Sequence, residues 1–124
     1  DVERSRGLGD VYKRQERICD VRLAEYLGVW VHVYNSPIGL PPDPERAEAL
    51  HERMLPAFTF LNDVLADGRD FVCGDAPSPA DCTLQAFLNF MRFTGENLIA
   101  PYPHLTRWDD SYRSRPVIAA IIQP

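Results

Sequence analysis

The sequence predicts an all-α protein, and two observations carry that prediction. Apolar residues recur at helical spacing in several segments of the 124-residue chain, and prolines and glycines separate those segments. No two segments show the period-two alternation expected of a pair of strands. We therefore expect a helical bundle with one core, because a chain of this length folds around a single core.

The first expected helix covers residues 16–34, ERICDVRLAEYLGVWVHVY. Leu23, Leu27 and Trp30 recur at helical spacing within it. Its β-branched end is also compatible with a strand, but the chain offers no partner strand. Gly28 weakens the helix by up to about 1 kcal/mol relative to alanine, so we expect another helix to pack closely there.

A proline-rich loop, NSPIGLPPDP, precedes a second expected helix at residues 45–66. Asp43 occupies the N-cap position of this helix and Pro44 its first position, where the missing N–H costs nothing. One face is apolar and contains Leu50, Met54, Phe58, Leu61 and Leu65. Gly68 ends the helix. A short extended connector then leads to the next helix.

The most apolar segment, residues 79–93, begins with a capping-box pattern. Ser78 and Asp81 are three residues apart, so each side chain can accept a hydrogen bond from the other residue's backbone N–H. Because this helix is apolar on nearly every side, we expect other helices to surround it, with Cys82 buried. The role of Ser78 and Asp81 is then structural. Loss of the cap in Asp81→Ala is expected to cost about 1–2 kcal/mol.

Residues 103–113 are expected to form a short helix with Leu105, Trp108 and Tyr112 on its inner side. Pro116 begins a final helical turn or two, VIAAII, near the end of the chain. No internal repeat separates the chain into further units.

Composition excludes several classes of function. Thirteen basic against eighteen acidic residues give a net charge of −5, and no basic cluster is present, so we expect no nucleic-acid partner. The apolar stretches are too short to span a bilayer, so we expect no membrane partner. The three cysteines (Cys19, Cys73, Cys82) are irregularly spaced and match neither a disulfide framework nor a metal site. Reduced thiols favour a cytoplasmic location.

The three histidines lie on separate elements, and we interpret them as surface or hydrogen-bonded residues rather than ligands. They are His32, His51 and His104. We therefore expect neither a metal site nor a catalytic residue in this chain.

Residues 5–15, SRGLGDVYKRQ, resemble a translated sequencing adapter. The segment contains Lys13, the only lysine of the chain, whereas the other basic residues outside it are all arginines. We interpret residues 1–15 as a non-native segment, and residues 16–124 as the domain.

Two motifs carry a resemblance to a known family. Phe71-Val72-Cys73-Gly74-Asp75 followed by Ser78-Pro79-Ala80-Asp81 is similar to the hallmark of the all-helical C-terminal domain of cytosolic glutathione transferases. The segment Pro103 to Trp108, with Arg115-Pro116-Val117 beyond it, resembles the ending of the same domain. The resemblance covers residues 16–122 and implies the same helical bundle, with Ser78 and Asp81 at the N-cap of the buried helix.

The resemblance also implies a function. In this family the thiolate of glutathione, the co-substrate, attacks an electrophile, and a thioredoxin-like domain binds glutathione and activates its sulfur. Nothing in this chain resembles that domain, so the chain alone is expected to be inactive. The helical domain would contribute a wall of the pocket for a small hydrophobic electrophile, and a homodimer interface in the full-length protein.

The first helix usually builds that wall, which makes the aromatic stripe Tyr26, Trp30 and Tyr34 the candidate substrate-binding set. The alternative is that these rings only pack in the core or an interface. Two other interpretations of the chain remain open. It is either a non-catalytic glutathione transferase-like module for protein–protein docking, or an unrelated helical bundle that shares the cap and the ending.

Overall fold

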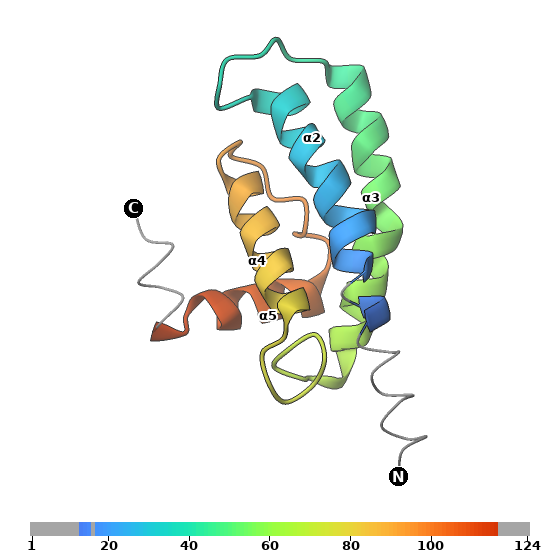
Figure 1. Cartoon of the computed structure of the whole chain (residues 1–124), viewed down its shortest axis with the longest axis vertical. Helices are drawn as coiled ribbons and strands as arrows, with labels where there is room; N and C mark the ends of the chain where they lie inside the picture. The colour runs from blue at the N-terminus through green and yellow to red at the C-terminus, as the bar shows by residue number, and fades with distance from the viewer. Residues whose placement is uncertain (1–12, 16, 117–124) are drawn as a thin grey trace.

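The computed structural model describes residues 13–15 and 17–116, and this part of the chain is helical (Figure 1). Its elements are the π-helical segment η1 (Ile18–Ala24), α2 (Glu25–Asn35), α3 (Pro44–Val64), the 3₁₀ turn η2 (Leu65–Asp67), α4 (Pro79–Arg92) and α5 (Pro103–Arg113). The described residues contain no β-strand, and Phe71 and Gly74 form an isolated antiparallel β-bridge. The all-α prediction is confirmed.

The second helix, expected at residues 45–66, runs from Pro44 to Val64 and continues as the 3₁₀ turn Leu65–Asp67, and the first helix differs more. Residues 13–15 and 17 are already helical, Gln15 is buried, and the first half of the expected first helix is π-helical rather than α-helical. The helical turn expected at residues 117–122 lies outside the described residues.

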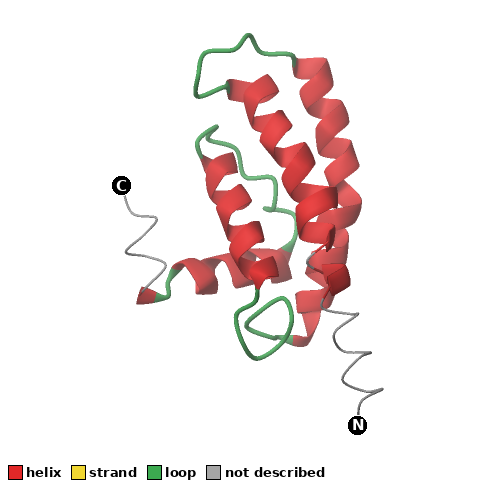
Figure 2. Ribbon diagram, in the orientation of Figure 1, coloured by secondary structure: helices red, strands yellow, loops and turns green. Residues whose placement is uncertain are grey.

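Helices α2 and α3 run antiparallel side by side, joined by the loop at the top of Figure 1. Helix α4 lies on the other side of α2, and α5 crosses below α4 at a steep angle (Figures 1 and 2). The core lies between these four helices and takes residues from each of them. Its largest fully buried side chains are Leu23, Leu27, Met54, Phe58, Leu61, Leu65, Leu84, Leu88, Met91, Ile99, Leu105 and Trp108.

The start of α4 is fixed by the carboxylate of Asp81, which is fully buried. The capping box with Ser78 is present. Asp81 Oδ2 accepts hydrogen bonds from both the backbone N–H and the hydroxyl of Ser78, each at 2.9 Å. Asp81 Oδ1 accepts from the backbone N–H of Val72 and from the indole Nε1–H of Trp108, also at 2.9 Å each. One carboxylate therefore joins the connector, α4 and α5.

Side chains from distant elements also satisfy two other helix ends. The Asn62 side-chain oxygen of α3 accepts from the backbone N–H groups of His104 and Leu105, at 2.9 and 3.1 Å, and so caps the start of α5. In return, Arg107 of α5 donates to the carbonyl oxygens of Leu65, the C-cap residue of α3, and of Arg69 in the connector, at 3.0 and 3.1 Å. These reciprocal caps hold α3 and α5 in register.

Two expectations about close packing are wrong. A Cβ placed on Gly28 would lie 3.8 Å from the Phe87 ring, which is ordinary van der Waals contact, so no helix approaches closely enough to require glycine there. Helix α4 is not surrounded either, because Cys82 in its first turns and Phe93 directly after its last residue are exposed. The helices of the described chain cover only one side of α4, and its opposite side stays open.

Candidate functional site

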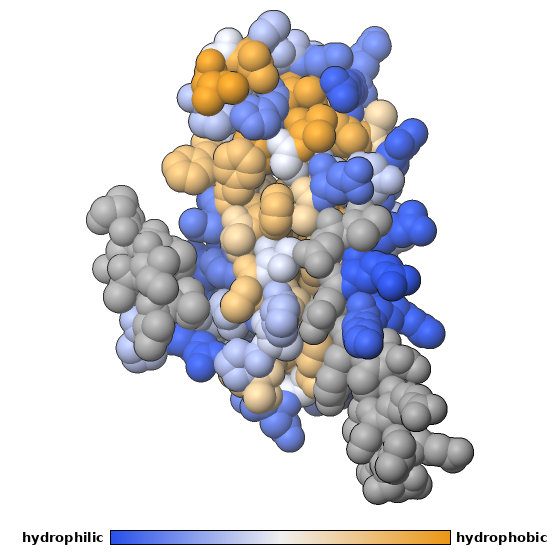
Figure 3. Space-filling model, in the orientation of Figure 1, coloured by the Kyte–Doolittle hydropathy of each residue, from blue (hydrophilic) through white to orange (hydrophobic). Residues whose placement is uncertain are grey.

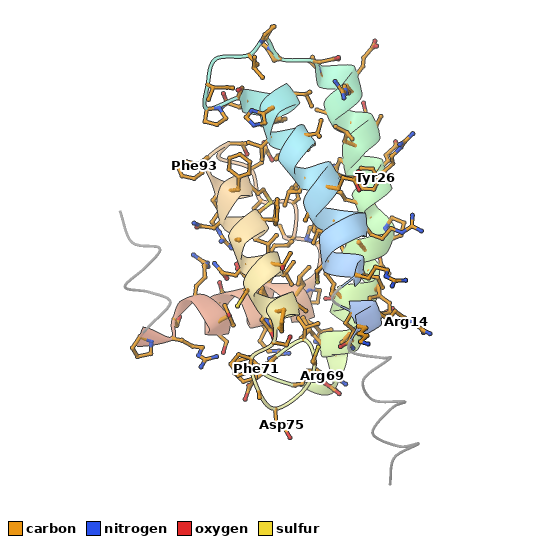
Figure 4. The ribbon with its side chains drawn as sticks, in the orientation of Figure 1. Arg14, Tyr26, Arg69, Phe71, Asp75 and Phe93 are labelled. Atoms are coloured by element: carbon orange, nitrogen blue, oxygen red, sulfur yellow. The ribbon has the colours of Figure 1, made fainter. Side chains whose placement is uncertain are left out.

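The aromatic stripe predicted on the first helix divides into two parts. The rings of Trp30 and Tyr34 stack, with centroids 4.8 Å apart and planes inclined by 16°. Tyr26 lies two turns before Tyr34, is partly buried against the core and does not line the pocket that the other two share (Figure 4). The structure thus brings together Trp30 and Tyr34, but not Tyr26.

Trp30 and Tyr34 line a pocket of about 290 Å³ between the end of α2, the start of α3 and the segment that follows α4. Ala47 and Leu98 are buried residues of its wall. Its full lining is Trp30, Tyr34, Pro44, Ala47, Glu48, His51, Glu96 and Leu98. The volume suits a fragment-sized ligand, at the lower end of small-molecule sites.

The lining of this pocket includes hydrogen-bond acceptors. The Tyr34 hydroxyl donates to Glu96 Oε1 at 2.5 Å. That hydrogen bond, followed by burial and the negative charge of Glu96, raises the pKa of Tyr34 above its ordinary value of 10.0. Glu48 and His51 belong to the same lining. The pocket therefore offers aromatic surface together with two carboxylates.

Sequence reasoning missed six members of this lining, and a local signal was available for the four that lie on α3. Pro44, Ala47, Glu48 and His51 share one face of α3 at helical spacing, so the sequence already places Glu48 beside His51. His51, which we interpreted as a surface or hydrogen-bonded residue, is half-buried in the pocket. Glu96 has no local signal, because only the return of the chain after α4 brings it to Tyr34.

A second pocket of about 420 Å³ lies on another side of α2, under the α2–α3 loop. It is lined by Val29, His32, Val33, Leu40, Pro41, Asp43 and Arg46. Leu40 and Phe93 are exposed by 49% and 71%, and apolar residues gather over the upper half of the face seen in Figure 3. Figure 4 places Phe93 at the upper end of α4, beside this face. An exposed apolar region of this kind marks an interaction surface.

Cys82 departs from the sequence interpretation, since it is exposed on the first turns of α4 rather than buried. Its sulfur lies 3.7 Å from the Tyr112 hydroxyl. Burial, followed by the contact with Cys82, raises the pKa of Tyr112 to about 12. Ser78 and Asp81 lie nearby but are occupied with the cap, so their role is structural.

Within residues 13–15 and 17–116, no group of three or more histidine, cysteine, aspartate or glutamate side chains is arranged to hold a metal ion. In the same part of the chain, no helix combines the length and apolar character that a membrane crossing requires.

Comparison with known families gives one match that covers about half of the chain. The model of the family described as "Glutathione S-transferase, C-terminal domain" matches residues 44–108. These residues include α3, the capping box and Trp108. A comparison with curated proteins finds no match.

Several solved structures share the fold. The chain resembles Gtt2 from Saccharomyces cerevisiae with a TM-score of 0.74 and 22% identity, over 90% of this chain and 55% of that one. It resembles a glutathione S-transferase domain-containing protein from Marinobacter aquaeolei VT8 with a TM-score of 0.71 and 24% identity. That match covers 90% of this chain and 56% of the other chain.

A third similar structure is glutathione S-transferase-I bound with the ligand lactoylglutathione, with a TM-score of 0.77 and 18% identity. That match covers 94% of this chain and 55% of the other chain. The chain thus spans little more than half the length of the structures it resembles. At sequence identities of 18–24%, the similarity to these structures shows a shared fold and nothing about function.

Proposed function

Because the chain belongs to the family of glutathione S-transferase C-terminal domains, we propose that it forms the helical wall of an electrophile site beside bound glutathione. The stacked pair of Trp30 and Tyr34 carries this proposal. It presents aromatic surface in a pocket at the end of the first helix, the helix expected to build such a wall.

In the proposed reaction the sulfur of the glutathione thiolate forms a bond to an electrophilic carbon of a small hydrophobic substrate. A leaving group departs from that carbon with its bonding electron pair, or, in an addition, the displaced electron pair of a carbon–carbon double bond takes up a proton. Trp30 and Tyr34 would hold the substrate ring by stacking. The Tyr34 hydroxyl already donates a hydrogen bond to Glu96, so it is not available to a glutathione sulfur. We therefore assign activation of the sulfur to a thioredoxin-like domain elsewhere in the whole protein, and we expect the present chain alone to be inactive.

The open apolar side of α2 and α4 supports the same proposal. Phe93, the residue that follows α4, is exposed, and so is Leu40 of the α2–α3 loop. We propose that the thioredoxin-like domain covers this side. We further propose that the full-length protein is a homodimer in the cytoplasm. A non-catalytic docking module is the second candidate, since the same apolar side would serve a protein partner.

Binding to the pocket is tested with 1,3-dinitrobenzene, an unreactive analogue of aromatic electrophiles whose nitro groups quench indole fluorescence. The chain has two tryptophans, of which Trp30 lines this pocket and Trp108 does not, so quenching by a ligand in the pocket reports mainly on Trp30. We expect saturable quenching that Tyr34→Ala weakens. The matched control is Leu55→Ala, an exposed position of α3 outside the pocket. Equal affinity of wild type and Tyr34→Ala would overturn the pocket assignment.

Catalysis requires the whole protein, and sequencing the source DNA across the junction between residues 15 and 16 is the first step. We expect the adapter-like residues 1–15 to be absent from the genome and a thioredoxin-like reading frame to precede residue 16. Glutathione conjugation by that protein, with a raised KM in Tyr34→Ala, would support the enzyme. An intact protein that binds dinitrobenzene without conjugating glutathione would favour the docking module.

A further inference from the structure

We propose that the pocket beside Trp30 and Tyr34 prefers an organic cation, such as a quaternary or aryl-substituted ammonium group, over a neutral ligand of the same shape. The proposal rests on the assignment of this pocket as the ligand site of the domain, and it narrows the chemical class of the ligand. Three features of the pocket carry it: the aromatic pair, the charges and the size.

The aromatic pair provides a face for a cation. Trp30 is buried behind Tyr34 and stacks on it at 4.8 Å, while Tyr34 keeps 39% of its surface exposed. The face of an aromatic ring carries negative electrostatic potential, so a cation within about 6 Å of its centre is attracted. Tyr34 is fixed in place by its hydrogen bond to Glu96. The Tyr34 ring is therefore preorganised for ligand binding.

The charges of the lining have one sign. Glu48 and Glu96 contribute carboxylates, and the lining contains neither arginine nor lysine. Neither carboxylate forms an ion pair with another residue of the described chain. Tyr34 occupies Oε1 of Glu96, and no hydrogen bond within the described chain occupies Oε2. Two negative charges beside an aromatic face favour a cation and disfavour an anion.

The neighbouring pockets show that this charge pattern is local. The pocket under the α2–α3 loop includes Arg46. A third pocket of about 240 Å³, between η1 and α3, is flanked by Arg22 and Arg53. The preference for a cation is therefore not a consequence of the net charge of −5 alone.

The size limits the ligand to a compact group. A volume of about 290 Å³ with Ala47 and Leu98 in its wall accommodates a small ammonium head with a short apolar or aryl substituent. His51 is the remaining titratable side chain of the lining. The test is run at about pH 8, above the ordinary pKa of a histidine side chain.

The test compares benzyltrimethylammonium with its neutral carbon isostere, 2,2-dimethylpropylbenzene, on the full 124-residue chain. The ¹H–¹⁵N resonance of the Trp30 indole reports binding, and that of buried Trp108 is the internal reference. We expect the cation to bind about tenfold more tightly than the isostere, as a partly desolvated cation–π contact implies. Added salt should weaken binding of the cation but not binding of the neutral isostere.

Charge variants identify the residues responsible. Glu48→Gln and Glu96→Gln should each weaken binding of the cation about threefold, with little effect on the isostere. Glu25→Gln is the matched control, because Glu25 is an exposed residue of α2 outside the pocket and its loss changes the net charge equally. Full affinity for the cation in the Glu48→Gln, Glu96→Gln double variant would overturn the proposal.

The remaining outcomes separate this inference from the proposed function. Equal affinity for the cation and the isostere would overturn the charge preference and leave the pocket as the ligand site. Preferential binding of the cation in a full-length protein that does not conjugate glutathione would support the charge preference and contradict the enzyme. Absence of binding by both probes would overturn the charge preference, while conjugation is still measured separately.

Discussion

The indole Nε1–H of Trp108 donates a 2.9 Å hydrogen bond to Oδ1 of Asp81, across 27 positions of the chain. Both residues are fully buried. Asp81 is the N3 residue of the capping box of α4, and Trp108 belongs to α5. A local helix-start signal therefore also fixes a tertiary contact. This contact has an energetic consequence that the cap alone does not predict.

Asp81→Ala is expected to cost about 3–5 kcal/mol of unfolding free energy, more than the 1–2 kcal/mol of a lost cap. The reason is that the buried N–H groups of Val72 and Trp108 lose their acceptor as well. Urea unfolding monitored by circular dichroism measures the difference. Asp75→Ala, an exposed position in the same connector, is the control and should change stability by less than about 0.5 kcal/mol. A loss near 1 kcal/mol in Asp81→Ala would contradict this account.

The cap that Asn62 provides to α5 gives a second prediction. Asn62→Ala removes the acceptor of two backbone N–H groups and should cost about 1–2 kcal/mol. Asn62→Asp keeps the acceptor and adds negative charge at the start of α5, so its stability should equal or slightly exceed that of the wild type. Thermal unfolding of the two variants checks the prediction, which is wrong if both variants lose equal stability.

Gly28→Ala should stabilise the protein by about 0.5–1 kcal/mol. Alanine restricts the unfolded chain and favours the helix, and its Cβ meets Phe87 at an ordinary distance of 3.8 Å. Urea midpoints of the variant and the wild type measure the gain. A destabilised Gly28→Ala protein would show that α2 and α4 need the glycine to approach each other.

Ionisation of the Tyr112 hydroxyl should lower the free energy of unfolding at alkaline pH. Its pKa is raised to about 12 by burial and by Cys82, whereas the unfolded chain titrates near the ordinary value of 10.0. Between these values the unfolded state loses its proton first, so the free energy of unfolding decreases as pH rises from about 10 to about 12. Tyr112→Phe removes this contribution. Chemical unfolding at several pH values should therefore give a shallower alkaline decline for the variant, and equal slopes would contradict the assignment.

The open apolar side predicts self-association of the chain. Phe93 is 71% exposed, and a contiguous apolar surface favours contact between molecules. Phe93→Ser should shift the chain toward the monomer in sedimentation velocity. A wild-type chain that is monomeric at high concentration would contradict the proposal that another domain covers this side. Leu55→Ala, on α3, serves as the control.

The sequence by itself determined the fold class, the family and most helix boundaries. These follow from local signals: the apolar spacing of the α3 face, the proline at the first position of α3, α4 and α5, and the reciprocal pattern of Ser78 and Asp81. Such signals act within one or two turns, where the backbone and its nearest side chains decide the outcome. The π-helical start of the first helix had no such signal.

The tertiary structure alone decided which side chains meet. It joined Glu96 to Tyr34, Asn62 to the start of α5, and Trp108 to Asp81. It also left Cys82 exposed and separated Tyr26 from its two stripe partners, because the packing of α3 and the segment after α4 determines which part of the stripe borders a pocket. These contacts join residues far apart in sequence, so no local pattern encodes them.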